Sequence, residues 1–151
     1  MLSEHAERCL PFAAEALFDL AADIEQYPLY LPGWQCARIA SRTAERVQAE
    51  QAVGVGPVRL QFHTTALLHR PLAIDVTSDD PQFTHFRLGW TFVADAPRRC
   101  RIGLDVELEV RAALLQRAIE SLAPGAVDTT LEAFARRARQ ILDVPCDQGV
   151  M

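Results

Sequence analysis

The sequence predicts an α+β fold in which a curved antiparallel sheet wraps around a long C-terminal helix. Between Trp34 and about Arg111, apolar residues recur at every second position, as in strands with one buried face. Between about Ala112 and Leu142, they recur at helical spacing, and charged residues occupy the opposite face. Because a sheet with one apolar face needs a cover, we expect the terminal helix to lie against it.

The N-terminal part of the chain is predicted to form a strand and two helices. The first ten residues have the pattern of a short strand, and Pro11 follows them. Phe12–Ile24 carries a stripe of apolar residues at helical spacing. Pro28 and Pro32 bracket the apolar piece Tyr27–Leu31, so we expect one or two helical turns there, ending before Pro32.

About six strands follow, joined by short turns. Turn signals stand at Gly54–Pro57, Arg70–Pro71 and Asp79–Pro81. Short turns between consecutive strands predict an antiparallel meander. Gln51 and Thr64 share the parity of the apolar positions. These apolar positions are Val47, Ala49, Val53, Val55, Val58, Leu60, Phe62, Ala66, Leu72, Ile74, Val76, Phe86, Leu88, Trp90, Phe92, Ile102, Leu104, Val106, Leu108 and Val110.

The C-terminal helical pattern is interrupted at Pro124-Gly125. Proline removes a helical hydrogen bond and clashes with the preceding turn, so we expect two helices or one sharply kinked helix. Pro124 suits the first turn of the second piece, where its missing N–H would have no partner in any case.

Composition excludes several classes of protein. Fifteen basic residues, all of them Arg, stand against 20 acidic ones, and the net charge of −5 disfavours DNA and anionic lipid as partners. The absence of Lys excludes Schiff-base chemistry. No run of 18 apolar residues could span a bilayer. The four cysteines are far apart, which predicts reduced thiols in the core and a cytoplasmic protein.

The sequence offers neither metal ligands nor catalytic residues in a recognisable pattern. The histidines have no metal-binding spacing, and His63, His69 and His85 alternate with apolar neighbours, which predicts a solvated outer face. Asp105 and Glu107 share one strand face with Glu109, which is also typical of a solvated face. We therefore predict no metal site and no catalytic residue.

The apolar pattern leaves two interpretations of the interior open. Side chains of the sheet and the helix could meet and fill a solid core, which is what such alternation usually means. Alternatively, sheet and helix could stand apart and leave an apolar tunnel for a ligand. In a tunnel, Thr64 and Ser78 would be the polar groups, because both share the inward parity.

Several segments together resemble the coenzyme Q-binding family of the START-like, polyketide-cyclase-like superfamily. They are the opening FAAEALFDLAADIEQYPLYLPGW (12–34), FHTT (62–65), the Gly-Trp-x-Phe pattern at 89–92, CRIGLDVELE (100–109) and LEAFARRA (131–138). The resemblance implies a helix-grip fold with a hydrophobic tunnel between sheet and C-terminal helix. It implies a single START-like lipid-binding domain over 1–144, with 145–151 as a short tail.

Together with the inward parity of the strands and the C-terminal helix, the resemblance predicts which residues would contact a ligand. These are Tyr30, Trp34, Phe62, Thr64, Phe86, Trp90, Phe92, Leu104, Val106, Leu122, Val127, Leu131 and Phe134. Two departures from the family stand out. The family often has a Trp-Cys pair directly after the Leu-Pro, where this chain has Gly33-Trp34-Gln35-Cys36, and relatives run a continuous helix where this chain has Pro124-Gly125.

Three functions are consistent with this resemblance. The first is non-enzymatic binding of a hydrophobic molecule, an isoprenoid quinone such as ubiquinone or another lipid, in support of respiration or quinone biosynthesis. Its tail would lie in the tunnel and its ring near a polar mouth, with no other cofactor and with transient contact to the inner face of the membrane. The second is a ribosome-association toxin that binds the large subunit and blocks subunit association. The third, a polyketide cyclase or aromatase, would need an acid or base inside the pocket.

Overall fold

The structure is a computed structural model that describes residues 1–142. The predicted tail at 145–151, the domain boundary at 144 and Cys146 lie outside the described residues. The elements are, in chain order, β1 (Leu2–Leu10), α1 (Ala14–Ala22), the 3₁₀ helix η1 (Ile24–Gln26), α2 (Tyr27–Tyr30), β2 (Trp34–Arg42), β3 (Arg46–Val55), β4 (Val58–His69), β5 (Ala73–Thr77), β6 (Phe83–Ala96), β7 (Arg99–Val110), α3 (Ala113–Leu122) and α4 (Ala126–Leu142).

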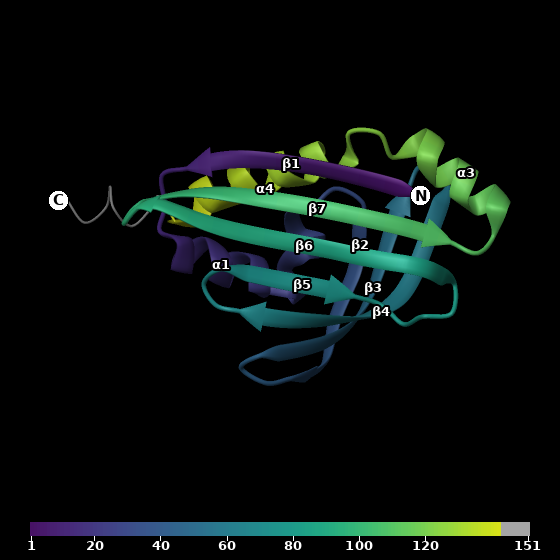
Figure 1. Cartoon of the computed structure of the whole chain (residues 1–151), viewed down its shortest axis with the longest axis horizontal. Coiled ribbons are helices and arrows are strands. Elements are labelled where there is room, and N and C mark those ends of the chain that lie inside the picture. Colours follow the sequence, from purple (N-terminus) through teal and green to yellow (C-terminus); the bar gives the residue numbers. More distant parts are fainter. Residues whose placement is uncertain (143–151) are drawn as a thin grey trace.

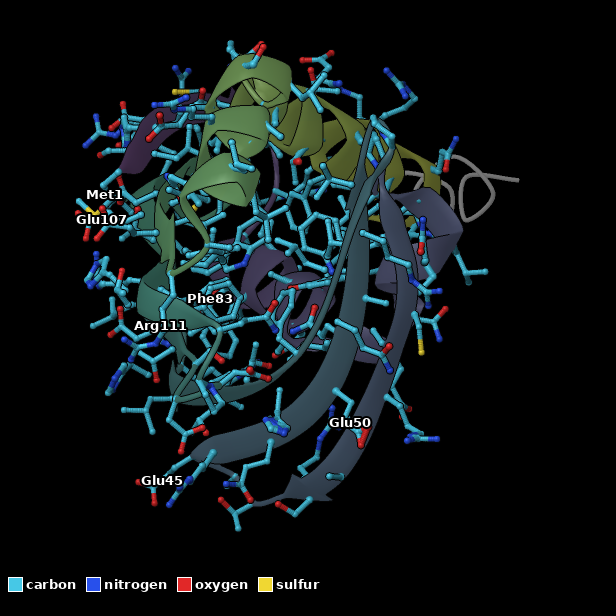
Figure 2. The ribbon with its side chains drawn as sticks, turned by 90° about the vertical axis from the view of Figure 1, so that its right-hand side faces the viewer. Met1, Glu45, Glu50, Phe83, Glu107 and Arg111 are labelled. Carbon is cyan, nitrogen blue, oxygen red and sulfur yellow. The ribbon has the colours of Figure 1, made fainter. Side chains whose placement is uncertain are left out.

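All the strands within the described residues belong to one antiparallel sheet with the order β1-β7-β6-β5-β4-β3-β2. Strands β2 to β7 form the predicted meander, and β1 pairs with β7 at the far edge. Figure 1 shows α4 behind β1 and β7, with α3 at the right-hand end of the molecule. Seen from that end, the sheet forms two walls and the helices lie across the open side (Figure 2). The predicted fold class is therefore confirmed.

The register of β6 on β7 places apolar residues opposite one another on the inner face. Trp90 pairs with Leu104 and Phe92 pairs with Ile102, and all four side chains are buried. A shift of one residue would turn each strand's apolar set outward, so burial of this face fixes the register.

The middle of α4 covers a solid part of the core. Leu131 and Phe134 are fully buried, and the Phe134 ring lies 4.8 Å from the ring of Trp90. Helix α1 fills the same region, where Phe18 meets Phe92 edge to face at 5.6 Å. Outside this contact, Arg8 of β1 binds Asp128 of α4 at 2.7 Å. This half of the molecule follows the solid-core interpretation.

The break at Pro124-Gly125 separates two helices, α3 and α4. The sequence predicted either two helices or one kinked helix, and the first alternative is confirmed. The position predicted for Pro124 is wrong, because it lies in the turn before α4 and not in the first turn of that helix. The turn is made by Gly125, whose φ of 82° is costly for any residue with a Cβ, and Ala126 donates its N–H to the carbonyl of Ala123.

Two further expectations are corrected by the structure. Leu72 is 66% exposed because it lies in the turn that precedes β5 and not on the inner face. Cys9 and Cys36 are exposed free thiols and not core residues. Cys100 is buried as expected, and this burial raises the pKa of its thiol to about 11.

Candidate functional site

An apolar cavity of about 380 Å³ lies at the α3 end of the molecule, between the inner face of the sheet and the helices. Its volume is within the range of small-molecule sites, about 300–1,000 Å³. Both interpretations of the interior therefore hold, each for one half of the molecule. The lining residues are Leu2, Glu4, Pro32, Gly33, Trp34, Val53, Gly54, Leu60, Phe62, Phe86, Leu88, Leu104, Val106, Leu108, Ile119, Leu122, Ala123, Pro124, Gly125, Ala126, Val127, Thr129 and Thr130.

Phenylalanine rings form one wall of the cavity. Phe62 of β4 and Phe86 of β6 line it with ring centroids 5.3 Å apart, and Phe83 packs against both at 5.3 and 5.1 Å. Figure 2 shows Phe83 on the inner side of the sheet wall. Tilted and edge-to-face contacts of this kind hold rings in place, so the wall is pre-formed.

Exposed residues from three loops surround the cavity mouth. Pro32 and Gly33 before β2 and Leu122 with Pro124 at the α3–α4 corner line the cavity, and Gly56 in the β3–β4 turn lies against Leu122. A Cβ on Gly56 would lie 3.2 Å from Leu122, so helix α3 packs directly on this turn. Leu122 is 45% exposed. The rim is thus mostly apolar and open to solvent.

Gly33 and Gly54 bring two segments of the rim together. Gly54 donates its N–H to the carbonyl of Gly33 at 2.8 Å, and Gly33 has a φ of 85°. A Cβ on Gly33 would lie 2.7 Å from the Gly54 carbonyl oxygen, closer than real Cβ atoms approach. Only glycine fits here. Trp34 follows Gly33 directly, at the point where the chain departs from the family pattern, and it lines the cavity.

Glu4 is the charged side chain among the described lining residues. Its carboxylate accepts the backbone N–H of Gly125 at 3.3 Å and that of Val127 at 3.4 Å. A carboxylate at the N-terminus of a helix satisfies otherwise unpaired N–H groups and interacts favourably with the helix dipole. Glu4 therefore anchors the start of α4 to the sheet edge at the mouth.

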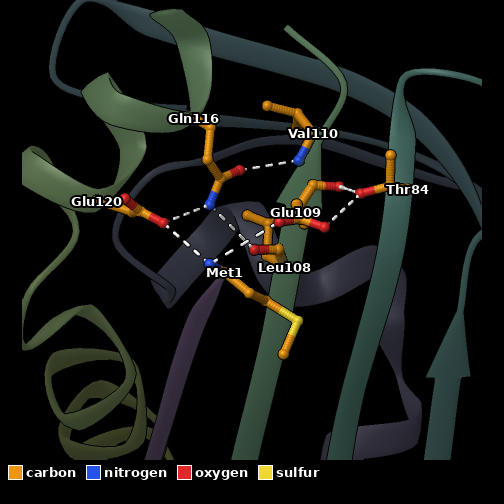
Figure 3. Close-up of polar contacts among 7 residues, drawn as sticks. All are labelled: Met1, Thr84, Leu108, Glu109, Val110, Gln116 and Glu120. Atoms are coloured by element: carbon orange, nitrogen blue, oxygen red, sulfur yellow. Dashed lines mark hydrogen bonds and ion pairs between the residues drawn. The ribbon is translucent and has the colours of Figure 1, made fainter. Parts of the chain in front are cut away.

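Helix α3 is held over the cavity by polar contacts (Figure 3). Gln116 accepts the backbone N–H of Val110 at 2.8 Å and donates to Glu120 at 2.9 Å. The ammonium group of Met1 lies 3.2 Å from Glu120 and 3.9 Å from Glu109. The Gln116 hydrogen bond and the nearby ammonium group lower the pKa of Glu120.

A smaller cavity of about 30 Å³ adjoins the inner end of the main one. Trp34 lines both cavities, and Gln51 lines the small one. The indole N–H of Trp34 donates to Oε1 of Gln51 at 2.8 Å, and Nε2 of Gln51 donates to the Thr64 hydroxyl at 3.0 Å. Gln51 and Thr64 are buried, with exposed fractions of 6% and 3%.

Two tyrosines lie beside this region without lining the main cavity. Burial raises the pKa of both hydroxyls, so both are neutral at physiological pH. Tyr27 donates to the carbonyl of Ala21. The Tyr30 hydroxyl is buried and has no hydrogen-bond partner among residues 1–142, and the Arg137 guanidinium lies 5.3 Å from the centre of its ring.

The structure brings about half of the residues expected to contact a ligand to the main cavity. These are Trp34, Phe62, Phe86, Leu104, Val106, Leu122 and Val127. Trp90 lines only the small cavity, and Thr64 lies behind Gln51.

The other residues of that set lie elsewhere, and the expectation that they line a tunnel is corrected. Phe92, Leu131 and Phe134 pack in the solid part of the core, and Tyr30 packs against Phe134. Alternation in the sequence indicates which face of a strand is inward but not how far the facing helix stands from it. Ser78 also lies outside, where its hydroxyl donates to the carbonyl of His63.

Three cavity features were missed by sequence reasoning. Glu4 and Leu2 come from β1, whose strand pattern gave no sign of a place in the wall. Gln51 could have been found, because it is a polar residue within a run of inward apolar positions.

The outer face of the sheet is polar, as predicted. His63, His69 and His85 are exposed and paired with acidic residues, His85 with Glu107 at 2.8 Å. His5 has the closest contact, 2.6 Å from Asp105. Within residues 1–142, no group of His, Cys, Asp or Glu side chains is arranged to hold a metal ion. In the same residues, no helix combines the length and the apolar character needed to cross a bilayer.

Comparison with known proteins agrees with this architecture. Residues 10–135 match the sequence profile described as polyketide cyclase / dehydrase and lipid transport. The chain is 30% identical over 142 residues to the ribosome association toxin RatA of Pseudomonas aeruginosa, covering 93% of this chain and 99% of that protein. It is 25% identical over 145 residues to the coenzyme Q-binding protein COQ10 homolog B of Xenopus laevis, covering 91% of this chain and 59% of that one.

The fold is shared with solved structures at low sequence identity. The Zhui aromatase/cyclase of Streptomyces sp. R1128 superposes with a TM-score of 0.77 at 16% identity, covering 93% of this chain and 96% of that one. The predicted START-like helix-grip fold is thereby confirmed.

Proposed function

Because the chain belongs to the polyketide cyclase / dehydrase and lipid transport family, we propose that it binds a neutral hydrophobic molecule in the cavity under α3. The observation that carries this proposal is the apolar cavity of about 380 Å³ with an exposed apolar rim. An isoprenoid quinone is the favoured ligand, since one relative is named a coenzyme Q-binding protein.

The physical driving force would be burial of the ligand's hydrocarbon tail. Each buried methylene contributes about 0.8 kcal/mol, so affinity should rise with tail length until the cavity is full. Glu4 adds a negative charge at the mouth, which disfavours fatty acids and other anionic lipids there.

A binding role without catalysis is favoured over a cyclase role. Acid–base chemistry needs a titratable group that can reach the substrate. Among the described lining residues this group would be Glu4, whose two carboxylate oxygens already accept backbone N–H groups of the α3–α4 corner and α4. Thr130, also in the lining, donates to the Ala126 carbonyl at 2.8 Å.

Mass spectrometry of the native protein, followed by lipid extraction, tests the binding role. We expect a bound quinone or neutral lipid in protein purified from its own host. Val106→Trp, on the cavity wall, should abolish this occupancy, because the indole fills the space. Val93→Trp, on an exposed position of β6, is the matched control and should retain the lipid. Protein from quinone-replete cells that carries no lipid would contradict the proposal.

Ribosome association is a second candidate function. The relative that favours it is a toxin named for this activity, which matches over nearly the whole length of both chains. Expression of the protein in its host should then reduce assembled ribosomes in a sucrose gradient and move the protein into the large-subunit fractions. An unchanged gradient with the protein at the top would exclude this role. Val106→Trp in the same experiment would show whether the role requires the cavity.

A further inference from the structure

Polar groups of the interior gather at the inner end of the cavity and not at its mouth. The central one is Gln51, which is buried with an exposed fraction of only 6%. At the mouth, both oxygens of Glu4 and the hydroxyl of Thr130 are engaged with α4 and the corner before it. The rim itself is formed by apolar groups such as Leu122 and Pro124.

The orientation of the Gln51 amide follows from its partners. The indole N–H of Trp34 can only donate, so the atom 2.8 Å from it must be the amide oxygen. The NH₂ group therefore faces Thr64, to which it donates one hydrogen at 3.0 Å. A primary amide has two N–H hydrogens, and the described residues provide a partner for one of them. A buried N–H without a partner is unfavourable, and a ligand oxygen would relieve this.

The second N–H has a route to the ligand. The small cavity, which Gln51 lines, shares Trp34, Phe62, Phe86 and Leu88 with the main cavity. Its volume of about 30 Å³ is far smaller than that of the main cavity, about 380 Å³, so it can take only a small part of a ligand. A molecule in the main cavity can place one oxygen there while the rest of it stays among apolar side chains.

We propose that Gln51 is a specificity-determining residue whose second amide N–H donates to a neutral oxygen of the ligand, such as a carbonyl, at the inner end of the cavity. The ligand then enters with its polar end first and leaves its hydrocarbon tail toward the rim at Leu122. This orientation is the reverse of a ring held at a polar mouth. The inference rests on the proposed binding function and adds the class of headgroup and its direction.

Two matched probes test this assignment. One is a decyl-trimethyl-1,4-benzoquinone, whose fully substituted ring does not add to the exposed thiols. The other is the decyl-trimethylbenzene with the same skeleton and no carbonyl. Isothermal titration calorimetry of the whole chain gives both affinities. We expect the wild type to prefer the quinone by about tenfold, the affinity equivalent of one hydrogen bond.

Two variants identify the group responsible. Gln51→Met keeps the side chain's length without its N–H and should abolish the preference, leaving the affinity for the hydrocarbon within about twofold. Gln48→Met makes the same substitution at an exposed position of the same strand, β3, outside both cavities, and should keep the preference. Equal affinities of the wild type for both probes, or a preference that survives in Gln51→Met, would overturn the assignment while the binding function stands. If neither probe binds, the binding function itself fails, and the assignment with it.

The direction of binding is tested on the wild type alone, so the test does not depend on how Gln51→Met folds. A polyethylene glycol chain attached to the tail end of the quinone should leave its affinity within about threefold, because the tail faces the rim. The same chain attached to the ring should abolish binding. The opposite result would show that the ring lies at the mouth and would overturn the proposal.

Discussion

The carboxylate of Glu4, on the edge strand β1, accepts the backbone N–H of Val127 in the first turn of α4 at 3.4 Å. A residue near the start of the chain thereby holds the first turn of the helix that packs against β1 and β7. The same carboxylate bonds Gly125, so the corner between α3 and α4 is anchored where it borders the cavity.

Replacing Glu4 by alanine should release this corner. Loss of a helix-capping carboxylate costs about 1 kcal/mol. We expect faster amide hydrogen exchange at Gly125 and Val127 and a lower thermal midpoint. Glu45→Ala, on the exposed hairpin between β2 and β3, is a matched control and should change neither (Figure 2). Unchanged exchange in Glu4→Ala would mean that the corner is held by packing alone.

Gly33 and Gly125 should respond differently to alanine. Both have a positive φ, near 85° and 82°, which costs a residue with a Cβ about 1–2 kcal/mol. Around Gly125 a Cβ would meet nothing within 4 Å, whereas at Gly33 it would lie 2.7 Å from a backbone oxygen. Urea unfolding should therefore show a larger loss for Gly33→Ala than for Gly125→Ala. Equal losses would show that the rim shifts to accept the methyl group.

Phe134 should behave as a core residue. Its ring is fully buried against Trp90, so Phe134→Ala leaves a hole in a solid region and should lower the free energy of unfolding by about 3–5 kcal/mol. Leu114→Ala, at a position 79% exposed, should change it by less than about 0.5 kcal/mol. Chemical denaturation measures both. A small loss in Phe134→Ala together with loss of lipid would instead place Phe134 in the ligand site.

His5 should give the protein a pH-dependent contribution to stability. Hydrogen bonds to Asp105 and then to Glu7 raise its pKa above the ordinary value of 6.5. Because the folded state holds the proton more tightly, this contribution is full below about pH 6.5 and disappears as pH rises through the raised pKa. His5→Gln should therefore lower the urea midpoint at about pH 5.5 and have little effect at about pH 8.5. An effect of equal size at both pH values would contradict this assignment.

The fold could be read from the sequence because its elements are long and strongly periodic. The alternation in β6 and β7 specified two inward faces, and Trp90 and Leu104 do pair on the inner side. The amphipathic stripe of α4 placed Leu131 and Phe134 inside correctly. Pro124-Gly125 marked the break between the last two helices, although the first turn of α4 begins after the proline.

The cavity could be predicted only in part. Inward parity selected Phe62 and Val106 for the wall, but it selected Phe92 with equal weight, and that ring is packed against Phe18. Parity cannot distinguish these cases because it carries no information on the distance between sheet and helix. Cysteine burial was misjudged for a different reason, because the expectation rested on the apolar character of cysteine, whereas Cys9 is on the exposed face of β1.

By itself, the sequence determined the order of the elements, the inner face of each strand and the apolar character of the interior, because these depend on local periodicity. Only the tertiary structure decided where the interior is hollow, that Glu4 closes the corner at the mouth, and that Gln51 turns its amide toward the inner end. These features depend on sheet curvature and on contacts between residues far apart in the chain, which no local pattern encodes.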